Sequence, residues 1–305
     1  MSTLAYFDIF NYPLTEGEIW KWLYCPANQR AVDGVGRDIF EVKKNLEENE
    51  KLKSLISTDR GFYFFKNREG LAETREERYL LAFKKMKRAK RIANFLKFIP
   101  GVKMIALCNT LAFANAREES DIDFFIVAAP NKIWTARFWA AGFLQIFGLR
   151  PSKKNNKDKI CLSFFVDTDS LNLESLSLGS PDIYLIYWVA QLVPLFDCSG
   201  IYHKFWQENS WIKNFLPNVF PRDAVDMMGE EIPSPGLPQK HASSGNLLGE
   251  NFLRWLQVKM LPRSLKEMAN RDSRVIITDK ILKFHANDRR EEYKKMWEEK
   301  ISKLL

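Results

Sequence analysis

Two aspartates near the middle of the chain have the spacing of a metal-binding pair. Asp121 and Asp123 open the run DIDFFIVA, whose apolar residues predict a strand. Residues two apart on a strand share a face, so both carboxylates point the same way. Neighbouring carboxylates repel each other and are costly to bury unpaired. A divalent cation between them would remove this conflict, and the pattern therefore predicts a metal site.

The strand that carries the two aspartates is expected to be buried on both sides. Ile122, Phe124 and Ile126 occupy the face opposite the carboxylates. Phe125 and Val127 continue the carboxylate face and are also apolar. There are two alternatives to a metal site. The two carboxylates could be solvated at the start of the strand, or they could form ion pairs with the basic helix upstream.

A second element just upstream suits a phosphate group. The sequence Leu107-Cys108-Asn109-Thr110 ends one predicted strand and begins a short helix. Asn and Thr are favoured where helices begin, and the free backbone N–H groups there form an anion site. Metal-binding carboxylates beside such a helix start indicate phosphoryl or nucleotidyl transfer.

At these residues the chain resembles the DNA polymerase β-like nucleotidyltransferase superfamily. The family pattern is Gly-Ser at a helix start and, a short interval later, Ser-Asp-x-Asp on the next strand. This chain has Asn109-Thr110 and then Ser120-Asp121-Ile122-Asp123. The order of its parts resembles a bacterial subgroup with a winged-helix-like front domain. The resemblance covers about residues 1–200, and its specific motifs lie within 107–127.

The resemblance implies roles for five residues. Asp121 and Asp123 would hold Mg²⁺, with Mn²⁺ as the alternative, and this cation would bind a nucleoside triphosphate. Thr110 would take the place of the family serine on a phosphate, and Asn109 and Ser120 would also contact the nucleotide. The implied reaction is in-line attack of a hydroxyl on the α-phosphate, with pyrophosphate leaving.

The chain departs from the family pattern at two places. Asn109 replaces a glycine whose missing side chain lets the phosphate approach closely. The family's third carboxylate lies on a later strand and activates the attacking hydroxyl. The matching strand here, ICLSFFV, is expected to show Cys161, Ser163 and Phe165 on one face, and its carboxylate, Asp167, follows only at its end. Asp167 serves the site only if the strands are offset.

These departures leave more than one function open. The first hypothesis is a Mg²⁺-dependent nucleotidyltransferase that moves a nucleoside monophosphate to an unknown hydroxyl acceptor. The alternative is a catalytically silent module that binds a nucleotide and docks a partner, which Asn109 and the missing carboxylate favour. A metal-dependent glycosyltransferase would need a larger sheet ahead of the aspartates than the single strand at 102–107.

Hydrophobic periodicity predicts an α+β chain of three parts. Residues 1–70 form three helices and a hairpin, the order of a winged helix. Residues 71–200 form the nucleotidyltransferase-like core, a small mixed sheet led by a basic helix at 75–97. Residues 201–305 are predicted to be helical, with a loop at 233–249.

Charge is unevenly distributed along the 305 residues. The chain has 46 Lys and Arg against 38 Asp and Glu, and its net charge is +8. Helix 75–97 carries nine of these cations and two acids, so it contributes +7. We expect a solvated face opposite a buried stripe that includes Tyr79 and Phe83, and a surface that attracts triphosphate or nucleic acid. Residues 1–70 have a net charge of −1, which favours a packing or partner-docking role over DNA binding.

Other features indicate a cytoplasmic protein with no membrane partner. The N-terminus lacks the pattern of a secretory signal, and the apolar runs at 133–149 and 183–196 are short or interrupted. The four cysteines include no CxxC pair, which excludes a zinc ribbon. Cys108 and Cys161 are expected in the core, and His285 is expected on the surface or in a loop.

Overall fold

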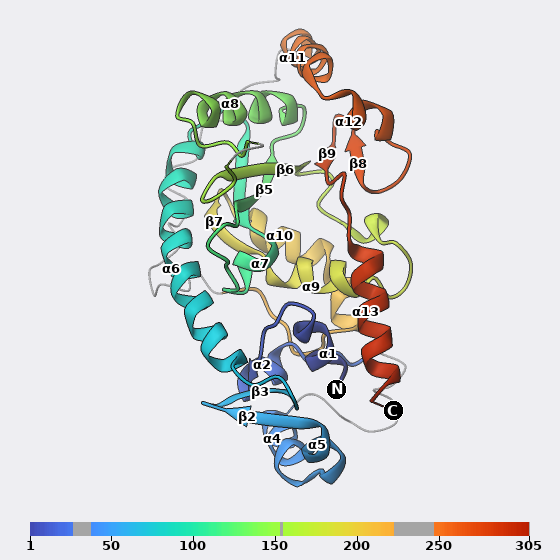
Figure 1. Cartoon of the computed structure of the whole chain (residues 1–305). Coiled ribbons are helices and arrows are strands. Elements are labelled where there is room, and N and C mark those ends of the chain that lie inside the picture. Colours follow the sequence, from blue (N-terminus) through green and yellow to red (C-terminus); the bar gives the residue numbers. More distant parts are fainter. Residues whose placement is uncertain (27–37, 153–154, 223–246, 305) are drawn as a thin grey trace.

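The computed structural model describes residues 1–26, 38–152, 155–222 and 247–304, which form a mixed α+β structure with two sheets (Figure 1). The expected loop at 34–36 lies outside the described residues. The same holds for 233–246 of the loop expected at 233–249, and residues 247–249 already belong to a helix.

The N-terminal part contains short helices and a small antiparallel sheet with the strand order β1-β3-β2. Thr15 begins the second helix with a capping box to Glu18, since each side chain bonds the other's backbone N–H. The helix that begins at Ile39 ends before Asn49, whose side chain caps a new helix. The elements are α1 (Ser2–Asp8), β1 (Leu14–Thr15), α2 (Glu16–Lys21), α4 (Ile39–Glu48), α5 (Glu50–Leu55), β2 (Ile56–Asp59) and β3 (Phe62–Phe65).

The larger sheet has six strands in the order β7-β4-β5-β6-β9-β8. Strands β5 and β6 are parallel, and the other neighbours are antiparallel. Pro194 lies in the edge strand β7, where a missing N–H costs least. The strands are β4 (Val102–Leu107), β5 (Ile122–Ala128), β6 (Ile160–Asp167), β7 (Val193–Asp197), β8 (Val275–Ile277) and β9 (Ile281–Phe284).

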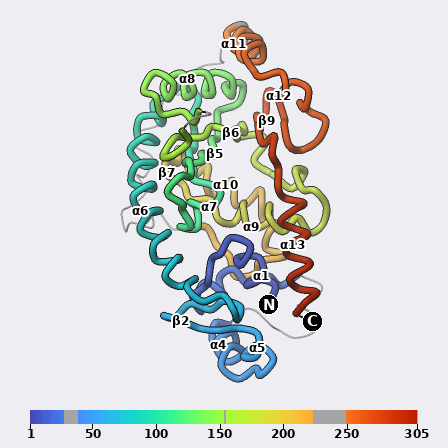
Figure 2. The backbone as a smooth tube through the Cα atoms, viewed as in Figure 1, coloured from blue at the N-terminus to red at the C-terminus, as the bar shows by residue number. Residues whose placement is uncertain are grey.

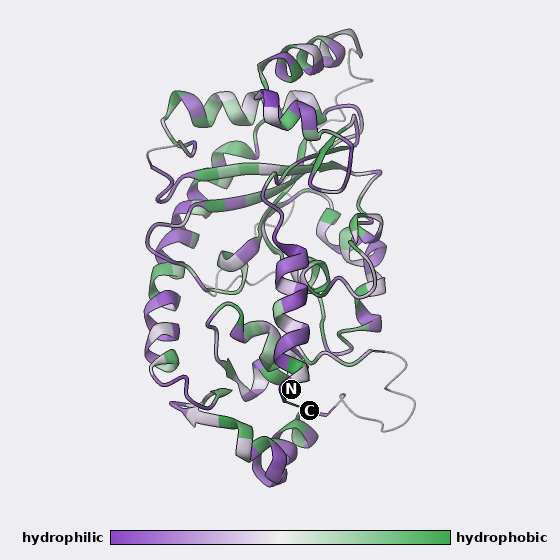
Figure 3. Ribbon diagram, turned by 45° about the vertical axis from the view of Figure 1, so that its right-hand side comes forward, coloured by the Kyte–Doolittle hydropathy of each residue, from purple (hydrophilic) through white to green (hydrophobic). Residues whose placement is uncertain are grey.

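Helices cover both faces of this sheet. The long helix α6 (Leu71–Leu96) and α8 (Ile133–Ile146) pack on one face, with Phe124, Ile126 and Phe165 in their core. Helices α9 (Ile183–Gln191) and α10 (Ile201–Glu208) pack on the other, with Phe125 and Phe164. The hydrophobic strands therefore lie between two helical layers (Figure 3). This arrangement confirms that the aspartate-bearing strand is buried on both sides.

The prediction that residues 201–305 are helical is wrong in part. Strand β9 pairs with β6, with Lys283 opposite Phe164, and β8 pairs with β9. Because β6 would otherwise be an edge with unpaired backbone groups, these strands complete the core sheet. The helices of this region are α10, α11 (Leu247–Met260), α12 (Arg263–Met268) and α13 (Arg290–Ser302).

The last helix returns to the start of the chain. Helix α13 packs against α1 and α9, and Figure 2 shows it running beside α1. Trp297 donates its indole N–H to the carbonyl of Ser2 at 2.9 Å, and Lys300 pairs with the buried Asp8 at 2.5 Å. The front of the chain, the sheet and the C-terminal helix are thus packed together.

Not all the cations of the basic helix α6 lie on a solvated face. Tyr79 and Phe83, expected in its buried stripe, are 44% and 37% exposed. Two cations are buried instead: Arg75 pairs with Glu18 at 2.8 Å, and Lys85 bonds the loop before β5. Part of the charge therefore holds neighbouring segments in place.

No helix among the described residues has both the length and the apolar character that a bilayer span requires.

Candidate functional site

A cleft of about 710 Å³ lies beside the start of strands β5 and β6. Its sheet side is formed by residues of these strands and by Asn109 at the start of α7 (Asn109–Ala112). Tyr184 and Trp188 of α9 line another side. The segment 283–290, which leads from β9 into α13, closes it. Three separate parts of the chain therefore build one cavity.

Asp121 and Asp123 both face this cleft, as their spacing predicts. Their ligand oxygens and the Cys161 sulfur all lie within 4.8 Å of one another. Burial, and then the neighbouring Asp121 charge, raise the pKa of Asp123 from 3.8 to about 6. Burial also raises the pKa of Asp121, and the charge of Lys85 partly offsets this. Two close carboxylates with raised pKa values are a donor set that suits a hard divalent cation.

Cys161 stands where a third carboxylate would face the pair. It lies opposite Asp123 in the parallel pairing of β5 with β6. Burial, followed by the charges of Asp123 and Asp121, raises the pKa of its thiol far above the usual range. The thiol therefore remains protonated at neutral pH, and Mg²⁺ prefers oxygen ligands. The expectation that Cys161 belongs to the core is wrong, since it lines the cleft.

A register shift changes which residues of β6 face the cleft. Between Asp123 and Phe125 on β5, the partner strand advances three residues, from Cys161 to Phe164. Such bulges are common beside functional sites because they redirect side chains. Cys161 and Ser163 share one face of β6, as expected, and both line the cleft. Phe164 follows them there, while Phe165 packs in the core on the opposite face. The prediction for Phe165 is therefore wrong.

Asp167, the expected third carboxylate, is not brought to the site. It pairs with Ala128, five residues along β5 from Asp123, which is about 16 Å at a strand's rise per residue. Its carboxylate instead accepts the backbone N–H of Asp169 at 3.1 Å. The strand offset that would bring Asp167 to the aspartates does not occur.

Asn109, the first residue of α7, has a backbone conformation that favours glycine. Its φ is +57°, in the left-handed region that Asn tolerates better than most residues. Its side-chain oxygen accepts hydrogen bonds from Trp188 at 2.9 Å and Tyr184 at 3.3 Å. Hydrogen bonding from its side chain lowers the pKa of Asp123, which partly offsets the effect of burial. Asn109 thus links helix α9 to the carboxylate pair.

Thr110 and Ser120, the two other residues expected to contact a nucleotide, are not among the described residues that line the cleft. The Ser120 hydroxyl donates to the carbonyl of Arg117 at 2.8 Å, and its own carbonyl accepts from Lys85 at 2.8 Å. Ser120 and Lys85 therefore hold the loop that precedes Asp121.

Ser163 and His285 form a hydrogen-bonded pair on the wall of the cleft. The Ser163 hydroxyl and His285 Nε2 are 2.9 Å apart, and both residues line the cavity. Burial, followed by the charge of Lys283, lowers the pKa of His285 to about 4, so the ring is neutral at pH 7. His285 lies in the loop between β9 and α13, as expected, and its ring lines the cleft. No sequence signal links these residues, which are 122 positions apart.

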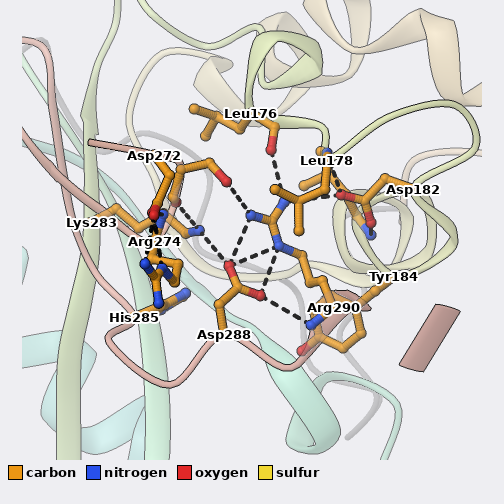
Figure 4. A network of polar contacts seen from close by, with 12 residues as sticks. Leu176, Leu178, Asp182, Tyr184, Asp272, Arg274, Lys283, His285, Asp288 and Arg290 are labelled. Carbon is orange, nitrogen blue, oxygen red and sulfur yellow. Dashed lines mark hydrogen bonds and ion pairs between the residues drawn. The ribbon is translucent and has the colours of Figure 1, made fainter. Parts of the chain in front are cut away.

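The C-terminal wall is held by a buried charge network (Figure 4). Arg290 donates to the carboxylate of Asp182 at 3.0 Å, to Asp288 at 2.9 Å and to the hydroxyl of Ser273 at 2.6 Å. Lys283 pairs with Asp288 at 3.3 Å, and burial lowers its pKa to about 8. Asp288 is the one further carboxylate among the described lining residues, and these two cations already engage it.

The two sides of the cleft differ in charge, because the C-terminal segment contributes three cations against one carboxylate, Asp288. The carboxylates of Asp121 and Asp123 lie on the sheet side, while the cationic residues of the lining belong to the C-terminal segment. A ligand that combines a cation with a polyanion would match both sides. The lining cations are Lys283, Arg289 and Arg290.

Comparison of the chain with protein-family models, with curated proteins and with solved structures finds no match.

Proposed function

We propose that the chain binds a nucleoside triphosphate through a divalent cation at Asp121 and Asp123 and transfers the nucleoside monophosphate to a hydroxyl group. The observation that carries the proposal is the convergence of these carboxylates, within 4.8 Å, in a cleft of about 710 Å³. Two carboxylates at this separation suit Mg²⁺ or Mn²⁺. A cation bound there would neutralise charge on the triphosphate and favour displacement at the α-phosphate.

The local order of elements supports the same proposal. Strand β4, helix α7, strand β5, helix α8 and strand β6 follow one another, and the carboxylates stand at the start of β5. The resemblance of residues 107–127 to the polymerase β-like nucleotidyltransferases rests on this same segment. Asn109 has the backbone conformation that favours the glycine of that motif.

The other walls suit the rest of a nucleotide. Tyr184 and Tyr293 stack with ring centroids 5.3 Å apart, and both line the cleft with Trp188. Aromatic faces of this kind favour contact with a base. Arg289, about half exposed, adds a cation on the same wall, where phosphate oxygens would be attracted.

A silent nucleotide-binding module is the second candidate, and one observation favours it. Cys161 takes the strand position opposite Asp123, and a protonated thiol cannot act as a third carboxylate. A module of this kind would bind the nucleotide and release no pyrophosphate. The two candidates therefore share a binding step and differ in the chemistry that follows it.

Calorimetric titration of the full chain with each of the four common triphosphates, in Mg²⁺ and in Mn²⁺, tests the proposal. We expect binding to the wild-type chain, a loss of at least about tenfold in Asp121→Asn, since cation affinity depends on ligand charge, and no change in Asp169→Asn. Asp169 is exposed and provides a carboxylate control outside the cleft. Absence of binding, or equal binding by Asp121→Asn, would overturn the proposal. Pyrophosphate release then separates the transferase from the silent module.

A further inference from the structure

The hydroxyl of Ser163 is already hydrogen-bonded to a base within the cleft. Its oxygen lies 2.9 Å from His285 Nε2, within the range of a strong hydrogen bond. The imidazole ring also packs edge-on against Phe164, with ring centroids 5.9 Å apart and an interplanar angle of 77°. Ser163 and His285 are each partly exposed and line the cavity. A bound ligand can therefore reach this pair.

Burial keeps the His285 ring neutral at pH 7, so one of its ring nitrogens is a hydrogen-bond acceptor. Burial lowers its pKa most, Lys283 and Arg290 lower it further and Asp288 raises it, giving a value of about 4. In the tautomer that is protonated on Nδ1, Nε2 accepts the Ser163 hydroxyl proton. A triphosphate in the cleft would bring negative charge close to the ring and make it a stronger base.

Ser163 lies on the same wall of the cleft as the two carboxylates. It is two residues from Cys161 on the cleft side of β6, about 6.6 Å along the strand. The Cys161 sulfur is itself within 4.8 Å of the Asp121 and Asp123 oxygens. A triphosphate bound through a cation at those carboxylates and extended along β6 would bring a phosphate toward the Ser163 oxygen.

We propose that Ser163 is a nucleotidyl acceptor, so that the chain modifies itself, with His285 as the general base. This inference rests on the proposed function, because the triphosphate must first bind beside Asp121 and Asp123. The Ser163 oxygen attacks the α-phosphorus and forms a phosphoester bond. The bond from the α-phosphorus to the bridging oxygen of the pyrophosphate breaks, and pyrophosphate leaves with that electron pair. The hydroxyl proton passes to His285 Nε2.

The same geometry explains how transfer proceeds without a third carboxylate. Asp167 is at the other end of β6, and Asp288 is engaged by Lys283 and Arg290. His285 is the remaining neutral base among the described lining residues. An external acceptor would have to displace Ser163 to reach it, whereas Ser163 is already hydrogen-bonded to the ring.

Intact-protein mass spectrometry after incubation with each triphosphate and Mn²⁺ or Mg²⁺ tests this inference. We expect a mass increase of one nucleoside monophosphate less water, and peptide mapping should place it on Ser163. Ser163→Ala should abolish the adduct, while Ser163→Thr should retain it on the threonine. His285→Gln keeps a hydrogen-bond acceptor but not a base, and should slow adduct formation by at least about 100-fold.

Matched controls and a binding measurement make the result decisive. Ser302→Ala and His203→Gln change exposed residues outside the cleft and should leave the adduct unchanged. Calorimetry should show that Ser163→Ala and His285→Gln still bind the triphosphate. If the wild-type chain binds triphosphate but gains no adduct, or gains it elsewhere, the inference is overturned and the proposed binding remains. If the wild-type chain binds no triphosphate, both are overturned.

Discussion

Cys161 lies opposite Asp123 in the pairing of β5 with β6, and its sulfur is within 4.8 Å of the Asp121 and Asp123 oxygens. A neutral thiol thus completes the wall of a site whose other two ligand groups are carboxylates. The thiol adds no charge for a cation and no further repulsion between the carboxylates. Compared with a third carboxylate, the thiol would therefore leave less repulsion in the metal-free site and offer a bound Mg²⁺ one charged ligand fewer.

Replacing Cys161 with aspartate should strengthen cation binding. Three carboxylates would then converge, and ligand charge is a main determinant of affinity for hard divalent cations. We expect Cys161→Asp to bind Mn²⁺ at least about tenfold more tightly than Cys161→Asn, which has the same shape without the charge. Calorimetric titration with Mn²⁺ measures this difference. Equal affinities in the two variants would show that position 161 does not contact the cation.

Asp123→Asn should stabilise the metal-free chain at neutral pH. The pKa of Asp123 is raised from 3.8 to about 6, so the folded state disfavours its charged form. The wild type therefore loses stability as pH rises from about 4 to 6, and the loss is complete above that range. Because Asp123 is partly exposed, we expect a gain of about 1–2 kcal/mol at pH 7 and almost none at pH 4.

Urea denaturation of wild type and Asp123→Asn at both pH values, with a chelator present, measures this pH-dependent gain. Asp169→Asn is the exposed control, for which no gain is expected. Added Mn²⁺ should stabilise the wild type and leave Asp123→Asn unaffected, since ligands stabilise only the state that binds them. A gain from Asp123→Asn that is equal at pH 4 and pH 7 would contradict the charge-based explanation.

Lys85→Met should destabilise the fold more than the same change at the neighbouring Lys84. The Lys85 amine is buried and bonds the carbonyl of Ser120 at 2.8 Å and the carboxylate of Asp158 at 2.5 Å. Removing it leaves these acceptors without their donor, at a cost of about 2–3 kcal/mol. Lys84 is exposed, so Lys84→Met should cost less than about 0.5 kcal/mol.

Urea denaturation compares the two lysine variants directly. Lys85→Met should also weaken Mn²⁺ binding, because Lys85 holds the loop that precedes Asp121 and so positions that carboxylate. Matching denaturation midpoints for the two variants would show that the buried amine is not important for stability.

Arg290→Met should loosen the C-terminal wall of the cleft. Arg290 is 6% exposed and is bonded to the buried Asp182 and to Asp288. Removing one partner of a buried ion pair leaves the other charge buried and unpaired, which lowers the free energy of unfolding by about 3–5 kcal/mol. Arg289→Met is the matched control, since Arg289 is about half exposed in a surface pair with Glu292 and should cost less than about 1 kcal/mol.

Urea denaturation midpoints compare the stabilities of Arg290→Met and Arg289→Met, and limited proteolysis shows which segment is loosened. Cleavage near residues 283–290 should increase in Arg290→Met and stay at the wild-type level in Arg289→Met. A stable, protected Arg290→Met variant would show that the network in Figure 4 does not hold this wall.

Local sequence patterns were sufficient to predict the parts of the core that lie close together in the chain. Strands β4, β5 and β6 and helix α6 appear where periodicity places them, because side-chain alternation and helical spacing are local properties. The shared face of Asp121 and Asp123 follows from the same rule. The sequence by itself therefore determined the carboxylate pair and the elements around it.

The tertiary structure alone decided what surrounds that pair. The register shift of β6 sets Cys161 beside Asp123 and turns Phe165 to the opposite face. Strand β9 brings His285 to Ser163 across 122 residues. Strand pairing and register depend on which distant segments cover the sheet, and no local period encodes that choice. The candidate base was therefore visible only in the folded chain, and only the fold showed that Asp167 does not reach the carboxylate pair.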